Sequence, residues 1–182
     1  MLFRSTVLLD ETQHLGRLVD DLRTVTLAEA GTLALHREPT DVGILVTEVA
    51  EGFQPQALAA SVRLVADVSD DVPLLDVDPV RIREVLENLL ANALRYAPAG
   101  SAIRLEARLA PGGRVTFLVA DQGPGIDPAL LPQIFDRFVK SDGSSGSGLG
   151  LAIARGIVEA HGGSIQAESD GSGTRIRFEL AV

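Results

Sequence analysis

Four polar residues of types that bind metal ions and phosphates follow one another at helical spacing. Glu84, Asn88, Asn92 and Arg95 are separated by four, four and three residues, so they form one stripe on a helix predicted over residues 79–95. Amide oxygens can ligate Mg²⁺, while amide NH₂ groups and an arginine can contact phosphate oxygens. Asn88 and Asn92 are the only two asparagines of the chain, although asparagine is a mediocre helix former. Such a stripe alone is more often a solvated helix face, so both interpretations stay open.

A second candidate group directly follows a predicted strand. Asp121 is succeeded by Gly123, Pro124, Gly125 and Ile126. Glycine lets the backbone approach a ligand closely, and a carboxylate can accept a hydrogen bond from the exocyclic amino group of adenine. A tight turn after a strand explains the same glycines and proline equally well.

A third candidate group is a glycine-rich segment that opens a helix predicted over residues 149–161. It consists of Gly146, Ser147, Gly148, Leu149 and Gly150. Backbone N–H groups bared by glycine at a helix start form an anion site. The segment is neither a dinucleotide-binding fingerprint nor a P-loop, because no strand leads straight into it and no Gly-Lys-Ser/Thr follows. The preceding residues 142–147 suit a lid over a ligand, or an ordinary flexible loop.

The pattern beyond residue 36 alternates helices and strands that can position these groups. Asp41 and the pair Asp78-Pro79 are predicted to start two helices, over residues 42–60 and 79–95. Strands are predicted over 62–68, 102–109, 114–120, 164–169 and 174–180, with a short apolar run over 74–77. Interleaved helices and hairpins predict an α+β fold, in which a mixed sheet carries helices on one face.

The first part of the chain, residues 5–30, predicts one long helix with a narrow apolar seam. The seam consists of apolar residues seven apart in two interleaved sets, Leu8, Leu15 and Leu22, and Leu18 with Val25. Such a seam packs helix against helix, and no second helix of that length follows. We therefore expect a partner helix or dimerisation along residues 5–30; packing onto the chain's own domain is the less favoured alternative.

The composition narrows the classes of function. The chain has 182 residues, of which 46% are hydrophobic and 23% charged, as in globular proteins. A net charge of −9 argues against nucleic acid or anionic lipid as partners. The absence of cysteine excludes a disulfide framework, a thiolate nucleophile and a zinc–thiolate site. No signal peptide or membrane span is expected in these residues, so we expect a cytoplasmic protein, attached to a membrane only through a partner or a preceding segment.

The order and spacing of the three groups resemble those of bacterial two-component sensor histidine kinases. The residues similar to the family's N, first glycine, F and second glycine boxes are Asn88-Leu-Leu-Ala-Asn92-Ala-Leu-Arg95-Tyr96, Asp121-x-Gly-x-Gly125-Ile126, Phe135-Asp-Arg-Phe138 and Gly146-x-Gly-Leu-Gly150-Leu151. Residues 1–35 resemble the second helix of the family's dimerisation domain, and residues 36–182 its catalytic ATP-binding domain. The resemblance implies the Bergerat fold, a two-layer α/β sandwich shared with DNA gyrase, MutL and a heat-shock chaperone.

The resemblance also implies ATP and Mg²⁺ as ligands and gives each candidate residue a part. Asn88 would hold Mg²⁺, while Asn92 and Arg95 would contact the phosphates. The Asp121 carboxylate would accept a hydrogen bond from the adenine amino group. The other residues expected around the nucleotide are Tyr96, Gly123, Gly125, Ile126, Lys140, Gly146, Ser147, Gly148, Leu149, Gly150 and Thr174.

Some features depart from the family's pattern. Arg95 stands where many members carry Lys, which keeps the charge but changes the geometry of the phosphate contact. The lid over residues 139–145 is short and has Lys140 as its only cation, with Phe135 and Phe138 expected to anchor it by packing. The family's phosphoacceptor, a His followed by Glu or Asp and then Arg-Thr-Pro, is absent from these residues.

None of the three histidines has the setting of that acceptor. His14 lies on the predicted second dimerisation helix and His36 on a predicted surface strand, while His161 ends a helix before two glycines, where it is expected to cap the helix. The chain is therefore expected to hold the phosphate donor and not the acceptor. It is either a part of a kinase divided between the two dimerisation helices or a natural split kinase.

The resemblance thus implies a protein histidine kinase. It would pass the γ-phosphoryl group of ATP to a histidine on a partner chain or a missing segment, for relay to an aspartate of a response regulator. Asn88 and Arg95 would stabilise the transferred group, and Glu84 is expected to polarise the incoming histidine. The alternatives are an ATP-hydrolysing Bergerat-fold ATPase and an ATP-binding scaffold without turnover.

Overall fold

The computed structural model describes residue 16, residues 18–140 and residues 146–182. A five-stranded sheet in the order β2-β4-β5-β7-β6 is formed by β2 (Arg63–Val68), β4 (Ala102–Ala110), β5 (Arg114–Ala120), β6 (Ser164–Asp170) and β7 (Gly173–Ala181). β2 and β4 run parallel, whereas all other neighbours in this sheet pair antiparallel. The predicted mixed sheet is confirmed, and its predicted strands end within one residue of the observed bounds.

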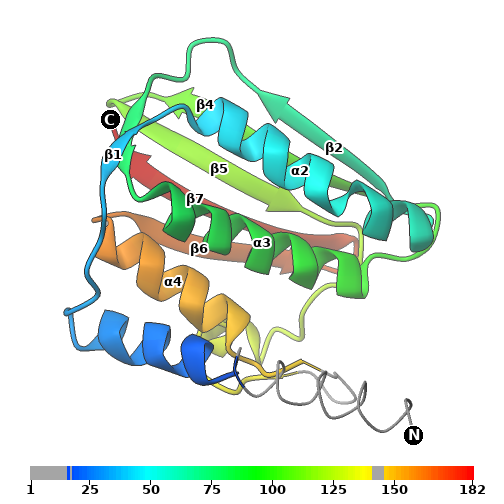
Figure 1. Cartoon of the computed structure of the whole chain (residues 1–182). Coiled ribbons are helices and arrows are strands. Elements are labelled where there is room, and N and C mark those ends of the chain that lie inside the picture. Colours follow the sequence, from blue (N-terminus) through cyan, green and yellow to red (C-terminus); the bar gives the residue numbers. More distant parts are fainter. Residues whose placement is uncertain (1–15, 17, 141–145) are drawn as a thin grey trace, which may run out of the picture.

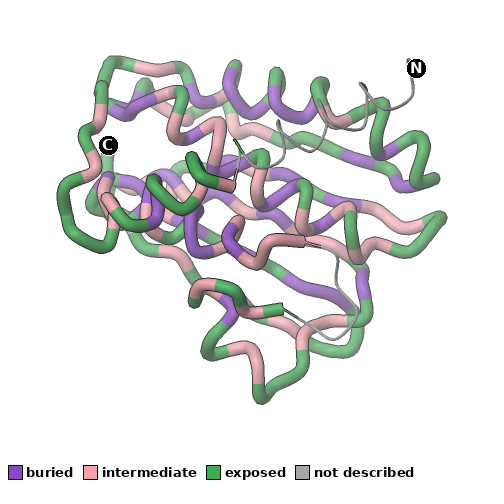
Figure 2. The backbone as a smooth tube through the Cα atoms, turned by 60° about the horizontal axis from the view of Figure 1, so that its bottom comes forward, coloured by how far each residue is buried: buried purple, intermediate pink, exposed green. Residues whose placement is uncertain are grey.

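Three helices cover one face of this sheet: α2 (Val42–Ala59), α3 (Pro79–Tyr96) and α4 (Gly150–Ala160) lie side by side on it (Figure 1). Alternate strand residues point into the helical layer, and there the rings of Phe117 and Phe178 stack with centroids 4.5 Å apart. Buried and exposed stretches alternate along the helices (Figure 2), as expected for amphipathic helices on a sheet. The fold is the predicted two-layer α/β sandwich. No helix in the described part of the chain has the length and apolar character needed to cross a membrane.

Both predicted helix N-caps are confirmed. The side chain of Asp41 accepts a hydrogen bond from the backbone N–H of Ile44 (3.1 Å), at the start of α2. The carboxylate of Asp78 accepts from the backbone N–H groups of Val80 and Arg81 (3.1 Å each), at the start of α3. A small antiparallel sheet of β1 (Glu38–Thr40) and β3 (Leu75–Val77) leads the chain to this point.

His161 joins the end of α4 to the start of α3. Its Nε2 accepts a hydrogen bond from the backbone N–H of Asp78 (3.0 Å), and its Nδ1 lies 2.8 Å from the carbonyl oxygen of Ile157. Because Nε2 accepts, the proton is on Nδ1 and the buried ring is neutral. His161 is the C-cap residue of α4, as predicted.

His36 does not lie on a strand, so that prediction is wrong. The pairing of β1 with β3 begins only at Glu38, opposite Val77. The backbone N–H of His36 donates instead to Oδ2 of Asp78 (2.9 Å), which takes this residue out of the strand ladder.

The N-terminal helix, described over residues 18–29, packs against the rest of the chain (Figure 1). Val25 is 2% exposed and belongs to the main hydrophobic core, whereas Leu22 is 42% exposed and Val19 66%. The expected seam is therefore divided: Val25 packs onto its own domain, which was the less favoured alternative, and Leu22 stays accessible. Leu8 and Leu15 lie outside the described residues.

Candidate functional site

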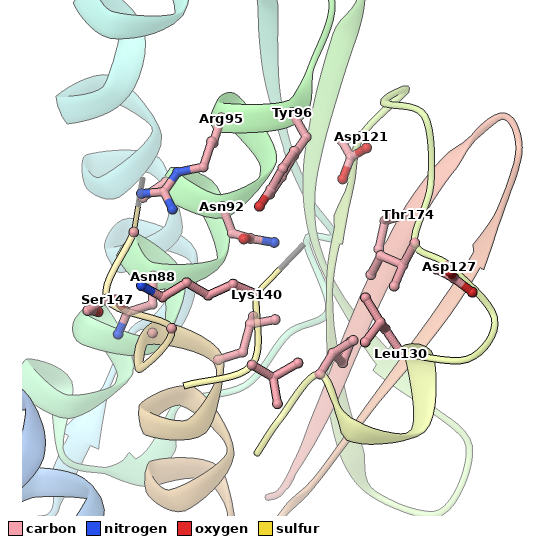
Figure 3. A pocket seen from close by; sticks show the side chains of 18 of the residues that line it. Asn88, Asn92, Arg95, Tyr96, Asp121, Asp127, Leu130, Lys140, Ser147 and Thr174 are labelled. Carbon is pink, nitrogen blue, oxygen red and sulfur yellow. The ribbon is translucent and has the colours of Figure 1, made fainter. Parts of the chain in front are cut away.

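A cavity of about 240 Å³ lies between α3, the loop after β5 and the segment that leads into α4 (Figure 3). Its polar and charged lining residues are Asp21, Asn88, Asn92, Arg95, Tyr96, Asp121, Asp127, Lys140, Ser147 and Thr174. Its other lining residues are Ala91, Gly125, Ile126, Leu130, Ile134, Val139, Gly146, Gly148, Gly150 and Leu151. All three groups singled out from the sequence meet here, although Glu84, Gly123 and Leu149 do not line the cavity.

Helix α3 forms one wall because its apolar face is buried and its polar stripe faces the cavity. Asn88, Asn92, Arg95 and Tyr96 all line it, each from the last three turns of the helix. A Cβ atom on Gly150 would lie 3.2 Å from Oδ1 of Asn88, so this amide oxygen faces the first turn of α4. The stripe is therefore more than a solvated helix face.

Glu84, the first residue of the same stripe, is engaged elsewhere. Its Oε2 lies 2.7 Å from Nη1 of Arg81, one turn earlier on α3. The same Nη1 donates to Oγ1 of Thr24 (3.5 Å) in the N-terminal helix. This pairing gives no support to the expected polarising part of Glu84, because its carboxylate is not part of the cavity wall.

Asp121 lies across the cavity from α3, at the end of β5 (Figure 3). Its Oδ1 accepts a hydrogen bond from the backbone N–H of Gly123 (2.8 Å), and its own N–H donates to the carbonyl of Thr174 (2.9 Å). Burial raises the pKa of Asp121 above its ordinary 3.8, against the backbone hydrogen bonds that the carboxylate accepts from Gly123 and Thr174, which lower it. The carboxylate keeps acceptor capacity for a donor in the cavity, since it has two oxygens.

The glycines beside Asp121 allow close packing of the loop. A Cβ on Gly123 would lie 2.9 Å from Oδ1 of Asp121 and equally close to the carbonyl oxygen of Tyr96. Gly125 has φ +79° and packs against the carbonyl oxygen of Asp170, so a side chain there would collide. Gly125 lines the cavity, whereas Gly123 supports Asp121 from behind. Of these two glycines, both expected around the nucleotide, only Gly125 therefore has a position that leaves room for a base.

The segment that enters α4 brings backbone close to the cavity. Gly146 packs against the guanidinium of Arg95, where a Cβ would collide with it. Gly148 has φ +74°, and its carbonyl accepts a hydrogen bond from the backbone N–H of Phe138 (2.9 Å). Leu149 is 2% exposed and belongs to the hydrophobic core, which is why it does not line the cavity. The unsatisfied N–H groups of the first turn of α4 give this end a positive partial charge.

The two phenylalanines before the lid behave differently. Phe135 packs against the core, as expected. Phe138 is 61% exposed with φ +64°, so the expected packing of its ring is wrong. The segment is held instead by the backbone hydrogen bond from Phe138 to Gly148. Of the lid over residues 139–145, only Val139 and Lys140 are described, and both line the cavity.

Several lining residues were not singled out from the sequence. Leu130 and Ile134 form an apolar wall together with Ile126, and their four-residue spacing was an available signal. Asp127 follows Ile126 directly and had no distinguishing pattern. Asp21 comes from the N-terminal helix, more than sixty residues before the first box, so no local motif could reveal it.

Asn88 suits a Mg²⁺ ion that is also held by phosphates. Across residues 18–140 and 146–182, no three His, Cys, Asp or Glu side chains gather as possible metal ligands. Mg²⁺ typically keeps several waters and takes few protein oxygens in addition to substrate phosphates. One amide oxygen beside a glycine-rich helix start therefore fits this ion, and a cage of protein ligands is not required.

Known proteins share both this fold and this sequence. The family model described as "Histidine kinase-, DNA gyrase B-, and HSP90-like ATPase" matches residues 77–182. The Adaptive-response sensory kinase SasA of Synechococcus sp. (strain JA-3-3Ab) is 34% identical over 176 residues, which cover 94% of this chain and 47% of SasA. This chain thus spans about half the length of that curated relative.

Solved structures agree. Full-length ShkA in complex with AMPPNP has a TM-score of 0.87 and 35% identity, covering 96% of this chain and 37% of ShkA. The histidine kinase ThkA in complex with the response regulator TrrA has a TM-score of 0.74 and 25% identity, covering 93% of this chain and 48% of ThkA. The chain belongs to the histidine kinase-, DNA gyrase B- and HSP90-like ATPase family, as the catalytic domain of a sensor histidine kinase.

Proposed function

We propose that this chain binds Mg²⁺ and ATP in the cavity and donates the γ-phosphoryl group to a histidine on a partner chain or on a segment outside these residues. The phosphoryl group would then pass to an aspartate of a response regulator. In this proposal residues 36–182 are the catalytic ATP-binding domain, and residues 1–35 belong to a dimerisation helix.

The observation that carries the proposal is the convergence of three distant parts of the sequence on one cavity. Asn88, Asp121 and the stretch that contains Lys140 and Gly148 are far apart in the sequence, yet all of them line it. A base and a chain of phosphates need opposite environments, and the two ends of this cavity offer them. The end at Asp121 has a carboxylate and apolar side chains, whereas the other end has two cations and a helix start.

Each part of the nucleotide has a residue to hold it. The ionised Asp121 carboxylate would accept a hydrogen bond from the adenine amino group. Asn92, Arg95 and the backbone at the start of α4 would orient the phosphates and stabilise charge as the γ-phosphoryl group leaves. A Mg²⁺ ion held by Asn88 would neutralise phosphate charge.

The proposal is tested by measuring ATP binding and the transfer of the phosphoryl group from labelled ATP. Wild type and Asn88→Ala are titrated with ATP in Mg²⁺ and in EDTA. They are then mixed with a synthetic helical peptide that carries a His followed by Glu and by Arg-Thr-Pro. We expect tight binding only with Mg²⁺ and only for wild type, together with acid-labile label on the peptide.

Three outcomes would contradict the proposal. Rapid release of phosphate with no labelled peptide would favour an ATPase. Absence of any nucleotide-induced thermal stabilisation would favour a scaffold without turnover. Label on a histidine of this chain itself, without the peptide, would contradict its part as donor only.

A further inference from the structure

The N-terminal helix reaches the cavity through Asp21. Among the described residues that precede β1, Asp21 is the only one that lines it. Asn88, Lys140 and Ser147 line the same cavity. In Figure 3 the N-terminal helix, in blue, lies on the side of Asn88 and Ser147, away from Asp121. The helix that carries Asp21 therefore lies at the end of the cavity that we assign to the phosphates.

The position of Asp21 is fixed by the turns that follow it. Thr24 and Val25 are buried, and Thr24 accepts a hydrogen bond from Arg81 of α3. Glu29 forms an ion pair with Arg137, in the segment before the lid. Ala28 packs on Gly156 of α4 so closely that a Cβ on Gly156 would lie 2.7 Å from it. Contacts with three separate segments hold this helix, so the approach of Asp21 to the cavity is part of the fold.

The same helix exposes apolar surface next to Asp21. Val19 is 66% exposed and Leu22 is 42% exposed, and Leu22 follows Asp21 by about 100° around the helix. Leu22 also belongs to the heptad seam that predicts a partner helix. A helix packed on Val19 and Leu22 would lie beside the phosphate end of the cavity. The occupant that this position fits is the helix that carries the phosphoacceptor histidine.

We propose that Asp21 is a positioning residue for that histidine: its carboxylate accepts a hydrogen bond from one ring N–H and thereby turns the other ring nitrogen toward the γ-phosphate. The proposal rests on the proposed function, because it names the residue that receives the acceptor. A carboxylate bonded to an imidazole N–H fixes the tautomer and orientation of the ring. This part was expected of Glu84, but Asp21 lines the cavity and Glu84 does not.

The transfer step balances with this arrangement. The lone pair of the second ring nitrogen forms the N–P bond while the bond from the γ-phosphorus to its bridging oxygen breaks, and that electron pair leaves with ADP. The ring gains positive charge, which the Asp21 carboxylate stabilises through the retained N–H. The proton then passes to solvent, leaving a neutral phosphorylated ring.

The test is transfer from labelled ATP to the histidine peptide described above, for wild type, Asp21→Asn and the matched control Asp20→Asn. Asp20 neighbours Asp21 but is exposed and does not line the cavity. We expect Asp21→Asn to slow transfer at least tenfold without weakening Mg·ATP binding, since an amide keeps the shape but loses the charge. Asp20→Asn should transfer like wild type.

The pH profile distinguishes positioning from a structural defect. A carboxylate raises the pKa of a bonded imidazole, and only the neutral ring attacks. The acidic midpoint of transfer should therefore lie at lower pH in Asp21→Asn than in wild type. A structural defect would lower the rate at every pH and leave the midpoint in place.

The other outcomes are equally distinct. Transfer at the wild-type rate by Asp21→Asn, or an unshifted midpoint, would overturn the inference and leave the proposed function intact. Weaker Mg·ATP binding by Asp21→Asn would make Asp21 a nucleotide or metal ligand and would likewise overturn it. Absence of transfer by wild type would contradict the proposed function itself, and the inference with it.

Discussion

The two ends of the cavity are built from different kinds of structure. The end at Asp121 stands on the sheet: Asp121 directly follows β5, Thr174 lies in β7, and Ser169 of β6 accepts a hydrogen bond from the N–H of Ile126 (2.8 Å). The other end stands on helices and long side chains, with Asn88 and Arg95 on α3 and Lys140 in the lid. One end is held by strand pairing, and the other depends on how two helices and a loop lie against each other.

This difference has consequences for binding. Groups that short backbone hydrogen bonds already hold in place lose little conformational entropy when a ligand binds. Removing such a group by substitution is therefore costly for binding, and neighbouring groups do not compensate for it. Flexible cationic side chains can substitute for one another in part. We therefore expect a single substitution at the sheet-built end to remove much of the affinity for the base. A single substitution among the phosphate contacts should weaken binding less.

The largest effect is expected at the sheet-built end. Asp121→Ala should weaken Mg·ATP binding by about 2 kcal/mol, or about 30-fold, because it removes a charged acceptor for the adenine amino group. Isothermal titration calorimetry measures the Kd. Inosine triphosphate, which lacks the amino group, should lose little affinity between wild type and variant. Asp136→Ala, an exposed carboxylate outside the cavity, is the control. Equal losses for both nucleotides would show that the two ends do not differ as described.

The helix-built end requires α3 and α4 to stay together, and His161 joins them. His161→Ala should lower the free energy of unfolding by about 2 kcal/mol at pH 7.5, since it removes a buried ring and leaves the Asp78 N–H without its acceptor. Urea denaturation measures the loss. His36→Ala is the matched control, because the His36 side chain is exposed and only its backbone N–H contacts Asp78.

The stability lost in His161→Ala should depend on pH, and the direction of this dependence follows from the pKa of His161. Burial lowers the pKa of His161 below its ordinary 6.5. The unfolded chain therefore takes up a proton at higher pH than the folded chain, and the stability due to the neutral ring is complete above pH 6.5. It is lost as the pH falls from 6.5 through the lowered pKa. The difference in stability between wild type and His161→Ala should shrink on acidification, and a constant difference would contradict the neutral buried ring.

Much of the fold could be predicted because its signals are local. Strand alternation, the caps Asp41 and Asp78 and the glycines after α4 each act within a few residues, and helices α2, α3 and α4 and the strands of the five-stranded sheet end within one residue of the predicted bounds. Phe138 was misjudged because a backbone hydrogen bond, which no side-chain pattern reveals, holds its segment. Val25 was misjudged because one apolar stripe suits a partner helix and a neighbouring domain equally well.

The site was predictable where side chains of rare type share one element, as Asn88 and Asn92 do on α3. It was not predictable where the fold brings remote segments together. Asp21 reaches the cavity only because residues 24, 25, 28 and 29 contact α3, α4 and the segment before the lid. Glu84 has the spacing expected of a site residue, but the spacing does not predict that its carboxylate pairs with Arg81.

A smaller effect is expected at the helix-built end. Arg95→Lys keeps the charge but loses the planar, bidentate geometry for phosphate oxygens. Mg·ATP binding should weaken by about 1 kcal/mol, or about fivefold, whereas adenosine binding should not change. Calorimetry with both ligands measures this. A loss for adenosine as well would mean that Arg95 shapes the whole cavity, including its sheet-built end, and would remove the proposed division.

The smallest effect concerns the charge of Asp121 itself. Two carboxylates with backbone hydrogen bonds behave oppositely. Burial acts to raise the pKa of Asp78, but backbone hydrogen bonds from His36, Arg81 and Val80 outweigh it and lower the pKa below 3.8; at Asp121 burial prevails and raises it. Carboxyl carbon shifts in an NMR titration should thus give midpoints on opposite sides of 3.8. Saturating adenosine should lower the Asp121 midpoint. The adenine amino group donates a hydrogen bond to the carboxylate, which stabilises the ionised form and makes the carboxylate harder to protonate. A midpoint that adenosine leaves unchanged would mean that the base does not use Asp121, and with it the reason for assigning adenine to the sheet-built end would be gone.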